Sequence, residues 1–208
     1  MFSSIKKYFK TKLFNILLSE NDGFKLKFFQ LAQNEFKKKS LDEYRHKYKI
    51  DKSFRFNGDM ILFYGEGEII CRENSYISDY SMLQSFTGCK IEIGKGCSLS
   101  SNVRIFTQTN IADQDFDKTE IEIKTGNVII GDHVWIGSNV VINPGIKIGA
   151  NSIIGANSVV SKDIPEFAIY GGVPARLIRQ KKYNQLIYKL ITNEIKKNFS
   201  NGRRWIYW

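Results

Sequence analysis

Hydrophobic residues recur at every sixth position through the second half of this chain. From Ile130 the sequence divides into IGDHVW, IGSNVV, INPGIK, IGANSI, IGANSV and VSKDIP, and an aliphatic residue begins each hexapeptide. The positions four residues after these anchors also hold only aliphatic or small side chains: Val134, Val140, Ile146, Ser152, Ser158 and Ile164. Because a period of six fits neither an α-helix nor an alternating strand, the pattern predicts short strands joined by regular turns in a parallel β-helix.

The same frame continues upstream and is interrupted once. It fits Ile93, Leu99 and Ile105, is lost after Asn110 and returns in register at Ile130. Residues 108–127 are therefore predicted to form a loop extruded between two coils. Three hexapeptides complete one triangular coil, and successive coils are expected to stack about 4.8 Å apart. Residues 67–91 follow a less regular version of the repeat and are expected to form the first coils.

The predicted fold is mainly β, with helical segments at both ends of the β-helix. Residues 1–55 are expected to form basic amphipathic helices, with Phe9, Leu13, Ile16 and Leu17 at helical spacing. The β-helix domain is predicted to cover residues 56–170. Residues 171–208 form the predicted C-terminal extension, with a helix at 181–199 and an aromatic tail, RRWIYW.

Glycines follow four of the anchors directly, at Gly131, Gly137, Gly149 and Gly155. A chain that turns a corner between two strands benefits from the backbone freedom of glycine. We therefore interpret these glycines as corner residues chosen for their conformational freedom.

Composition narrows the choice of partners. The chain has 208 residues and a formal net charge of +10, and its lysines gather near the two ends. This charge suits an anionic partner: a phosphorylated cofactor, an acidic glycan, or a membrane surface in contact with the basic N-terminal helix. A nucleic-acid partner is not expected, since no nucleic-acid-binding motif accompanies the charge. No apolar run approaches the roughly 20 residues of a membrane-spanning helix.

Three cysteines, Cys71, Cys89 and Cys97, are too few and too irregularly spaced for a disulfide framework or a zinc site. We expect them to be small buried side chains of a cytoplasmic protein. No metal site is predicted.

The segment VIIGDHVWIGSNVVINPGIKIGANSIIGANSVVSKDIPEFAIYGGVPARLIR carries the most specific motifs: VWIG, NPG, SKDIP and GGVPARLIR. It resembles the acetyl-CoA-binding half of the galactoside, maltose and polysaccharide acetyltransferases, and the resemblance covers roughly residues 90–180. It implies a left-handed β-helix, a homotrimer and acetyl-CoA as co-substrate without a metal. The implied reaction is acetyl transfer to a sugar of a surface glycan or its precursor, in the cytoplasm or at the inner face of the membrane.

The resemblance also implies the cofactor-binding residues, which are Ser138, Ala156, Ser161, Lys162, Arg176 and Arg179. The last three are cations near the end of the repeat, where they are expected to cluster, and the phosphates of coenzyme A call for charge-assisted contacts of this kind. Trp135 interrupts a row of aliphatic residues and glycines and is expected to line the acceptor groove. An anionic sugar acceptor is favoured by the charge of the chain.

The extruded segment differs from the family at its catalytic position. Family members carry there the histidine that removes the proton of the acceptor hydroxyl, and this chain has Asn110 in the sequence FTQTNIADQDF. A positioned base is typically worth a factor of about 100 to 10,000, and an amide cannot supply it. His46 and His133 are expected to be surface and turn residues. Asp113 and Asp115 would need a raised pKa to act as the base.

Three explanations of Asn110 stay open at the level of the sequence. The first is a substitution of the base introduced to trap a complex. The second is natural divergence toward an amino-sugar acceptor, which is nucleophilic as the free amine and needs less help from a base. The third is a catalytically silent homologue that binds the cofactor or serves as a scaffold, with its aromatic tail in contact with a partner.

Overall fold

A computed structural model describes residues 21–182 of the chain. The chain divides between Lys47 and Tyr48 into a helical unit and a β-helical unit. The predicted apolar stripe from Phe9 to Leu17, the tail RRWIYW and nearly all of the helix predicted at 181–199 lie outside the described residues. Within residues 21–182, no helix is long and apolar enough to cross a membrane.

The described part of the helical unit is one α-helix, α2 (Asp22–Lys47). Its apolar residues do not share one face, since Phe24 and Phe28 lie on one side and Leu26 and Phe29 on the other. All four side chains are at least 43% exposed. The helix therefore forms where it is expected but without an amphipathic pattern over these residues, and contact with a membrane stays a prediction.

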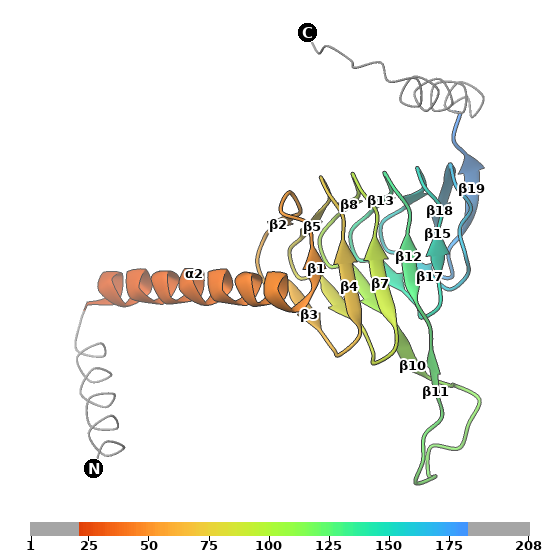
Figure 1. The fold of residues 1–208 in the computed structure, drawn as a ribbon, viewed down its shortest axis with the longest axis horizontal. Helices are drawn as coiled ribbons and strands as arrows, with labels where there is room; N and C mark the ends of the chain where they lie inside the picture. Colours follow the sequence, from red (N-terminus) through yellow and green to blue (C-terminus); the bar gives the residue numbers. More distant parts are fainter. Residues whose placement is uncertain (1–20, 183–208) are drawn as a thin grey trace, which may run out of the picture. The chain divides into compact units, whose positions relative to one another are not determined.

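The β-helical unit is built from three parallel sheets, which the chain visits in turn as face A, face B and face C (Figure 1). Face A contains β1 (Lys49–Ile50), β4 (Glu68–Cys71), β7 (Lys90–Ile93), β12 (Val128–Ile130) and β15 (Lys147–Ile148). Face B contains β2 (Arg55–Asn57), β5 (Tyr76–Ser78), β8 (Ser98–Leu99), β13 (Trp135–Ile136), β16 (Ile153–Ile154), β18 (Ala168–Gly171) and β19 (Arg176–Gln180). Face C contains β3 (Leu62–Tyr64), β6 (Met82–Gln84), β9 (Arg104–Phe106), β14 (Val141–Ile142) and β17 (Val159–Val160).

The turns that join these faces are corners AB, BC and CA. Strands of successive coils pair in parallel on every face, as in the pairs of β12 with β7, β13 with β8 and β14 with β9. This confirms the predicted parallel β-helix and is consistent with its left-handed form.

The side chains predicted to point inward are buried. The six anchors from Ile130 to Val160 are at most 2% exposed, and the residues four positions after them are at most 5% exposed. The polar members of the second set have backbone partners: Ser152 Oγ donates to the carbonyl of Pro165 at 2.7 Å, and Ser158 Oγ to that of Gly155 at 2.6 Å. Because these buried hydroxyls are hydrogen-bonded, serine is tolerated in an otherwise aliphatic core.

The glycines after the anchors have a different role from the one predicted. Gly131 and Gly137 do not have positive φ, and the left-handed conformation belongs to residues two positions later, His133 and Asn139, with φ of 57° and 59°. A Cβ atom on Gly137 would lie 2.6 Å from the backbone nitrogen of Ala156 in the next coil. Close approach of successive coils, rather than backbone freedom, therefore explains glycine here.

The β-helix extends beyond residues 56–170 at both ends. Helix α2 ends at Lys47, and β1 begins two residues later and pairs with β4. Aromatic residues fill the first coil, with ring centroids 5.3 Å apart for Phe54 and Phe56 and 5.4 Å apart for Phe56 and Phe63. They replace the aliphatic anchors there, which is why the repeat is hard to see in the sequence. At the other end, β19 turns back and pairs antiparallel with β18.

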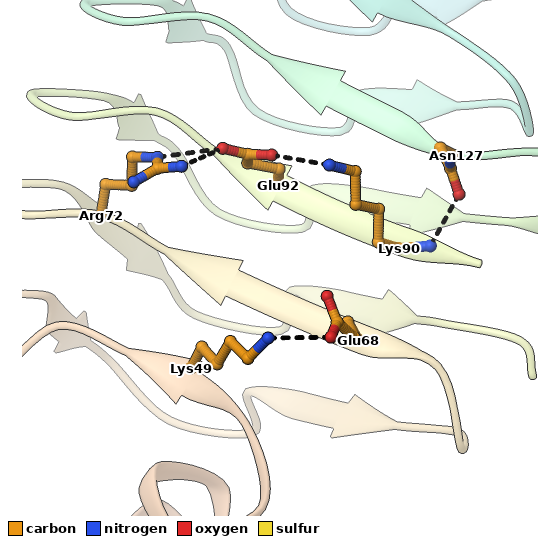
Figure 2. A network of polar contacts seen from close by, with 6 residues as sticks. All are labelled: Lys49, Glu68, Arg72, Lys90, Glu92 and Asn127. Atoms are coloured by element: carbon orange, nitrogen blue, oxygen red, sulfur yellow. Dashed lines mark hydrogen bonds and ion pairs between the residues drawn. The ribbon is translucent and has the colours of Figure 1, made fainter. Parts of the chain in front are cut away.

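Face A carries a network of charged side chains (Figure 2). Glu92 on β7 accepts hydrogen bonds from Arg72 Nε at 3.0 Å and from Lys90 Nζ at 3.1 Å, and Lys49 Nζ contacts Glu68 Oε1 at 2.9 Å. The Arg72 guanidinium, assisted by Lys90, holds the pKa of the Glu92 carboxyl below its usual value. Ion pairs between neighbouring strands are typical of a sheet face that is in contact with water.

Glu92→Gln is expected to lower the free energy of unfolding at pH 7 by about 1 kcal/mol, because it removes two ion pairs from a partly exposed face. Since the folded-state pKa is depressed, this stabilisation is present above the usual value of 4.5 and is lost as the pH falls through the folded-state pKa. The denaturation midpoints of the two proteins should therefore differ at pH 7 and converge once the pH lies below the folded-state pKa of Glu92.

Glu68→Gln is the matched control, since Glu68 contacts one lysine and its side chain is 52% exposed, against 17% for Glu92. A smaller effect is expected for this variant. Equal effects of the two substitutions on the free energy of unfolding would contradict a stabilising role of the Glu92 ion pairs. So would a difference between wild type and Glu92→Gln that persists in acid.

The extruded segment is a β-hairpin that extends away from the coils at corner CA (Figure 1). Its strands are β10 (Gln108–Asn110) and β11 (Ile123–Thr125), and they pair antiparallel with Asn110 opposite Ile123. Thr107 holds its base: the hydroxyl accepts a hydrogen bond from the N–H of Phe86 at 2.7 Å, and the carbonyl accepts one from the N–H of Gly126 at 2.9 Å. The excursion thus leaves the β-helix after Thr107 and rejoins it at Gly126.

Candidate active site

The predicted site residues fall into two groups on different sides of the β-helix. Trp135, Arg176 and Arg179 lie on face B, Ser138 and Ala156 at corner BC beside it, and Asn110, Ser161 and Lys162 at corner CA. In a three-sided coil, corner CA is opposite face B, so one chain does not bring the two groups together. Lys162, Arg176 and Arg179 all lie at the C-terminal end of the β-helix, and their clustering around the phosphates of a cofactor stays a prediction.

A single outward row runs along face B. The strand register places Ser98, Trp135, Ile153 and Ile169 in line, one on each successive strand. Trp135 is 53% exposed. The row therefore presents one large aromatic ring in its middle, with the small Ser98 on one side and aliphatic side chains on the other.

Two arginines lie on β19, the last strand of face B. Arg179 lies opposite Ile169 and Arg176 lies opposite Gly171 in the antiparallel pair of β18 and β19, and both arginines are exposed. Residues directly opposite each other in such a pair share one side of the sheet, so both arginines are on the outward side of face B, Arg179 at the end of this row and Arg176 beside it. Two neighbouring guanidinium groups are suited to bind phosphate oxygens in bidentate fashion.

Asparagines stack along corner BC, next to this row. Asn102 Nδ2 donates to Asn139 Oδ1, and Asn139 Nδ2 donates to Asn157 Oδ1, both at 2.9 Å. The N–H of Asn157 also donates to the carbonyl of Ser138 at 2.9 Å. All three asparagines have φ between 57° and 59°, which asparagine tolerates better than most residues. The ladder fixes the turns that carry Ser138 and Ala156.

Asn110 is exposed on β10, and the loop beyond it is held by Gln114. The amide of Gln114 bonds Glu122 twice, donating to its carbonyl at 2.8 Å and accepting from its N–H at 2.7 Å. Asp115 accepts a hydrogen bond from the N–H of Asp117 at 3.1 Å and so closes a turn, and Asp113 is exposed. Asn110 therefore stands on an ordered strand. The sequence gives no signal for Gln114, because its partners are backbone groups of Ile111 and Glu122, which no side-chain pattern identifies.

The two histidines and the buried cysteines lie on other parts of the chain than Asn110. His46 belongs to α2, and His133 is at corner AB, where a Cβ atom on Gly96 would lie 2.4 Å from its ring. His133 is thus an exposed turn residue, as predicted, and its ring packs over Gly96. Cys71 and Cys97 are buried, and burial raises the pKa of the Cys97 thiol to about 11, so it is not a nucleophile. Among residues 21–182, no group of three or more His, Cys, Asp or Glu side chains could hold a metal ion.

Two further residues of face B, Arg55 and Tyr76, were not predicted from the sequence. The register of β2, β5 and β8 places Arg55 and Tyr76 in line with Ser98, and hence in the same row as Trp135. The guanidinium carbon of Arg55 lies 5.5 Å from the centroid of the Tyr76 ring. The irregular spacing of the first coils concealed this alignment, because Arg55, Tyr76 and Ser98 are not separated by a constant number of residues.

Comparison with known proteins agrees with this architecture. Residues 127–162 match the family described as bacterial transferase hexapeptide (six repeats). A hexapeptide-repeat acetyltransferase of Vibrio cholerae O1 biovar eltor, solved with acetyl-coenzyme A, is 29% identical, with a TM-score of 0.55 over 66% of this chain and 74% of that chain. The N-acyltransferase AntD of Bacillus cereus, in a variant solved with dTDP-4-amino-4,6-dideoxyglucose and coenzyme A, shares the fold at 21% identity, with a TM-score of 0.58 over 76% of this chain and 96% of that chain.

The matched repeat covers the regular coils, and the likeness of fold extends over 66% of this chain. The six-residue period, the three-faced coil and these matches agree with one another. Residues 127–162 therefore carry the hexapeptide repeat of bacterial transferases, and the chain is similar in fold to a hexapeptide-repeat acetyltransferase.

Proposed function

We propose that this chain is an acetyl-CoA-dependent acetyltransferase that acts on a sugar of a surface glycan or its precursor. The observation that carries the proposal is the outward side of face B, with the exposed Trp135 in the middle of its row, Arg179 at the end of that row and Arg176 beside it. The similar acetyltransferase of V. cholerae was solved with acetyl-coenzyme A, which supports the same co-substrate here. The proposed reaction uses no metal and takes place in the cytoplasm, where acetyl-CoA is made, or at the inner face of the membrane.

The spacing along face B suits an extended cofactor arm. Three strand intervals separate β13 from β19, which is about 14 Å at about 4.8 Å per interval. The arm of coenzyme A between its phosphate and its sulfur has about as many chain atoms as four residues of peptide, and so it spans about 15 Å when extended. With the diphosphate at Arg176 and Arg179, the thioester would reach Trp135. The amides of the arm would then run beside the backbone at Ser138 and Ala156.

The reaction needs an activated nucleophile and a thioester. The acceptor oxygen or nitrogen attacks the thioester carbonyl, a bond to the acetyl carbon forms, and the carbon–sulfur bond breaks. The thiolate leaves and takes up a proton to give coenzyme A, and the proton of the acceptor passes to a base or to water. Asn110 can orient the acceptor by hydrogen bonds but cannot take its proton. Transfer to a hydroxyl is the main proposal, and transfer to an amino sugar is the alternative within the same site.

The first test of this function is direct. Calorimetry with acetyl-CoA and an assay of thiol release over a panel of sugars should show binding and transfer. A chain that binds no acetyl-CoA would overturn the proposal. Binding without transfer to any hydroxyl or amine acceptor would favour the silent homologue, whose proposed partner contacts involve the tail RRWIYW.

We also propose a homotrimer, because one chain separates the two groups of site residues. A threefold axis parallel to the β-helix would bring corner CA of one subunit against face B of the next. Face C supports such an interface because its outward side is apolar near β3 and β6: Leu62 and Tyr64 are 41% and 37% exposed, and the Tyr64 hydroxyl contacts the sulfur of Met82 at 3.6 Å. Face A, with its paired charges, is left toward solvent.

Mixed subunits are expected to recover activity that neither variant has alone. One variant combines Asn110→Ala with replacement of residues 112–121 by Asn-Gly, a two-residue turn that preserves the pairing of β10 with β11. The other combines Arg176→Gln with Arg179→Gln. If each site takes its hairpin from one subunit and face B from the next, random mixing leaves about a quarter of the sites intact. Thiol release should therefore return to about 25% of the wild-type rate after the two proteins are refolded together.

The matched control mixes each variant with itself, which should recover nothing. Sedimentation at micromolar concentration should show a species with three times the mass of one chain. A monomer, or mixtures that stay inactive although mixed trimers form, would contradict a site shared between subunits.

A further inference from the structure

We propose that the N-terminal half of face B binds a sugar ring that carries an anionic group, with Arg55 as the residue that recognises the anion. The inference rests on the proposed function, since this ring is taken to be the acetyl acceptor. The cofactor row from Trp135 to Arg179 uses only one half of face B. The other half continues the same row through Ser98 and Tyr76 to Arg55, on the far side of the thioester position.

The residues around Ser98 leave room for one ring. Tyr76 and Trp135 stand on the two strands that flank β8, two strand intervals or about 10 Å apart, and Ser98 lies between them. A small side chain between two aromatic ones leaves a gap on an otherwise flat sheet. A pyranose ring in this gap would place its apolar faces toward the aromatic rings and its hydroxyls toward Ser98. Such a ring would lie next to the thioester position at Trp135.

Arg55 gives this surface its charge. Its guanidinium carbon lies 5.5 Å from the centroid of the ring of Tyr76, its register partner on the strand between Arg55 and Ser98. No acidic side chain of residues 21–182 forms an ion pair with it. The ring holds the guanidinium by a cation–π contact. Its N–H groups are left to bind a carboxylate or a phosphate in bidentate fashion.

The outward side chains in the row next to Arg55, Tyr76 and Ser98 neither bind the anion in competition with Arg55 nor repel it. They are Asn57, Ser78 and Ser100, all polar and uncharged. The outward row thus has one cation at each end, with uncharged residues between: Arg179 for the phosphates of the cofactor, and Arg55 for an anion on the acceptor. A neutral acceptor would leave Arg55 without a role. The acceptor class that fits is a uronic-type sugar acid or a sugar phosphate.

The test compares three acceptors with one ring: methyl glucoside, which is neutral, methyl glucuronoside, which has a carboxylate, and glucose 1-phosphate. At least one anionic acceptor should have a KM about ten-fold lower than the neutral one, and this KM should rise with ionic strength. Arg55→Gln should raise it on the order of ten-fold and leave kcat and the KM of the neutral acceptor within about two-fold. The acceptor that responds distinguishes a carboxylate from a phosphate.

Matched variants separate recognition from folding. Arg55→Lys should recover only part of the affinity, because an ammonium lacks the planar fork of a guanidinium. Lys147→Gln removes an exposed cation from face A and should change none of these constants. Thermal denaturation should show the three proteins to be equally folded.

A binding measurement makes the test independent of turnover. Anionic sugars should quench the fluorescence of Trp135, identified by comparison with Trp135→Phe, and Arg55→Gln should weaken this quenching. Equal KM values for the three acceptors, unchanged in Arg55→Gln, with acetyl-CoA bound and thiol released, would overturn this inference and leave the proposed function intact. If acetyl-CoA is not bound, the proposed function fails, and anion-dependent quenching through Arg55 would still establish the sugar site.

Discussion

Asn110→His is expected to raise acetyl transfer to a hydroxyl acceptor by a factor on the order of 100 or more, with little change in the affinity for acetyl-CoA. The imidazole can accept the proton of the hydroxyl, which the amide cannot. The position should tolerate the change, because Asn110 is exposed and β10 pairs with β11 through the backbone. Steady-state thiol release measures the rate, and calorimetry measures the affinity.

Asn110→Ala is the control, and an amine acceptor provides the second comparison. If the natural acceptor is an amine, the histidine variant should gain little on it, and the alanine variant should lose activity through lost orientation alone. If the rate of thiol release by Asn110→His with a hydroxyl acceptor stays within about two-fold of wild type, then residue 110 does not occupy the position of the general base. Equal inactivity of all three proteins with acetyl-CoA still bound would favour the silent homologue.

Replacing Arg176 and Arg179 together by glutamine is expected to weaken acetyl-CoA binding by a factor on the order of 100. Each arginine is proposed to make charge-assisted hydrogen bonds to phosphate, and such a bond contributes about 1.5–3 kcal/mol. The lower part of this range applies, because both side chains are exposed to water. Calorimetry with acetyl-CoA, and with a pantetheine thioester that lacks the nucleotide, measures the effect.

The loss should be confined to the nucleotide end of the cofactor. The affinity for the pantetheine thioester should stay nearly unchanged, and the double variant of Lys95→Gln and Lys147→Gln, which removes the same amount of charge from other sides of the β-helix, should bind acetyl-CoA normally. Equal losses in the two double variants would mean that net charge, rather than the arginine pair on β19, attracts the cofactor.

Much of the fold could be predicted from the anchors alone. Residues such as Ile136 and Ile154 recur at a fixed period, and side chains in a strand alternate between inside and outside, so the period identifies the buried positions without further information. The departure of the chain after Thr107 was visible to within a few residues for the same reason, since the frame is lost after Asn110 and returns at Ile130.

The role of the glycines could not be predicted in this way. Whether Gly137 is needed for its φ or for its lack of a side chain depends on how near Ala156 of the next coil lies, and 19 residues separate the two positions. The first coil was also hidden, because Phe54 and Phe63 close the end of the core where aliphatic anchors are expected. Large rings are suited to an end position, since no further coil has to stack on them.

The sequence by itself determined the repeat, the buried positions, the place of the hairpin and the motifs of a hexapeptide-repeat transferase. Only the tertiary structure decided which outward residues stand in one row. Trp135 pairs with Ile153, 18 residues away, on one side and with Ser98, 37 residues away, on the other. Strands of successive coils pair in the same way whether or not a hairpin is inserted between them. The stacking of coils, and not distance along the chain, therefore aligns Arg55, Tyr76 and Trp135 on face B. It also places Asn110 away from them, at corner CA.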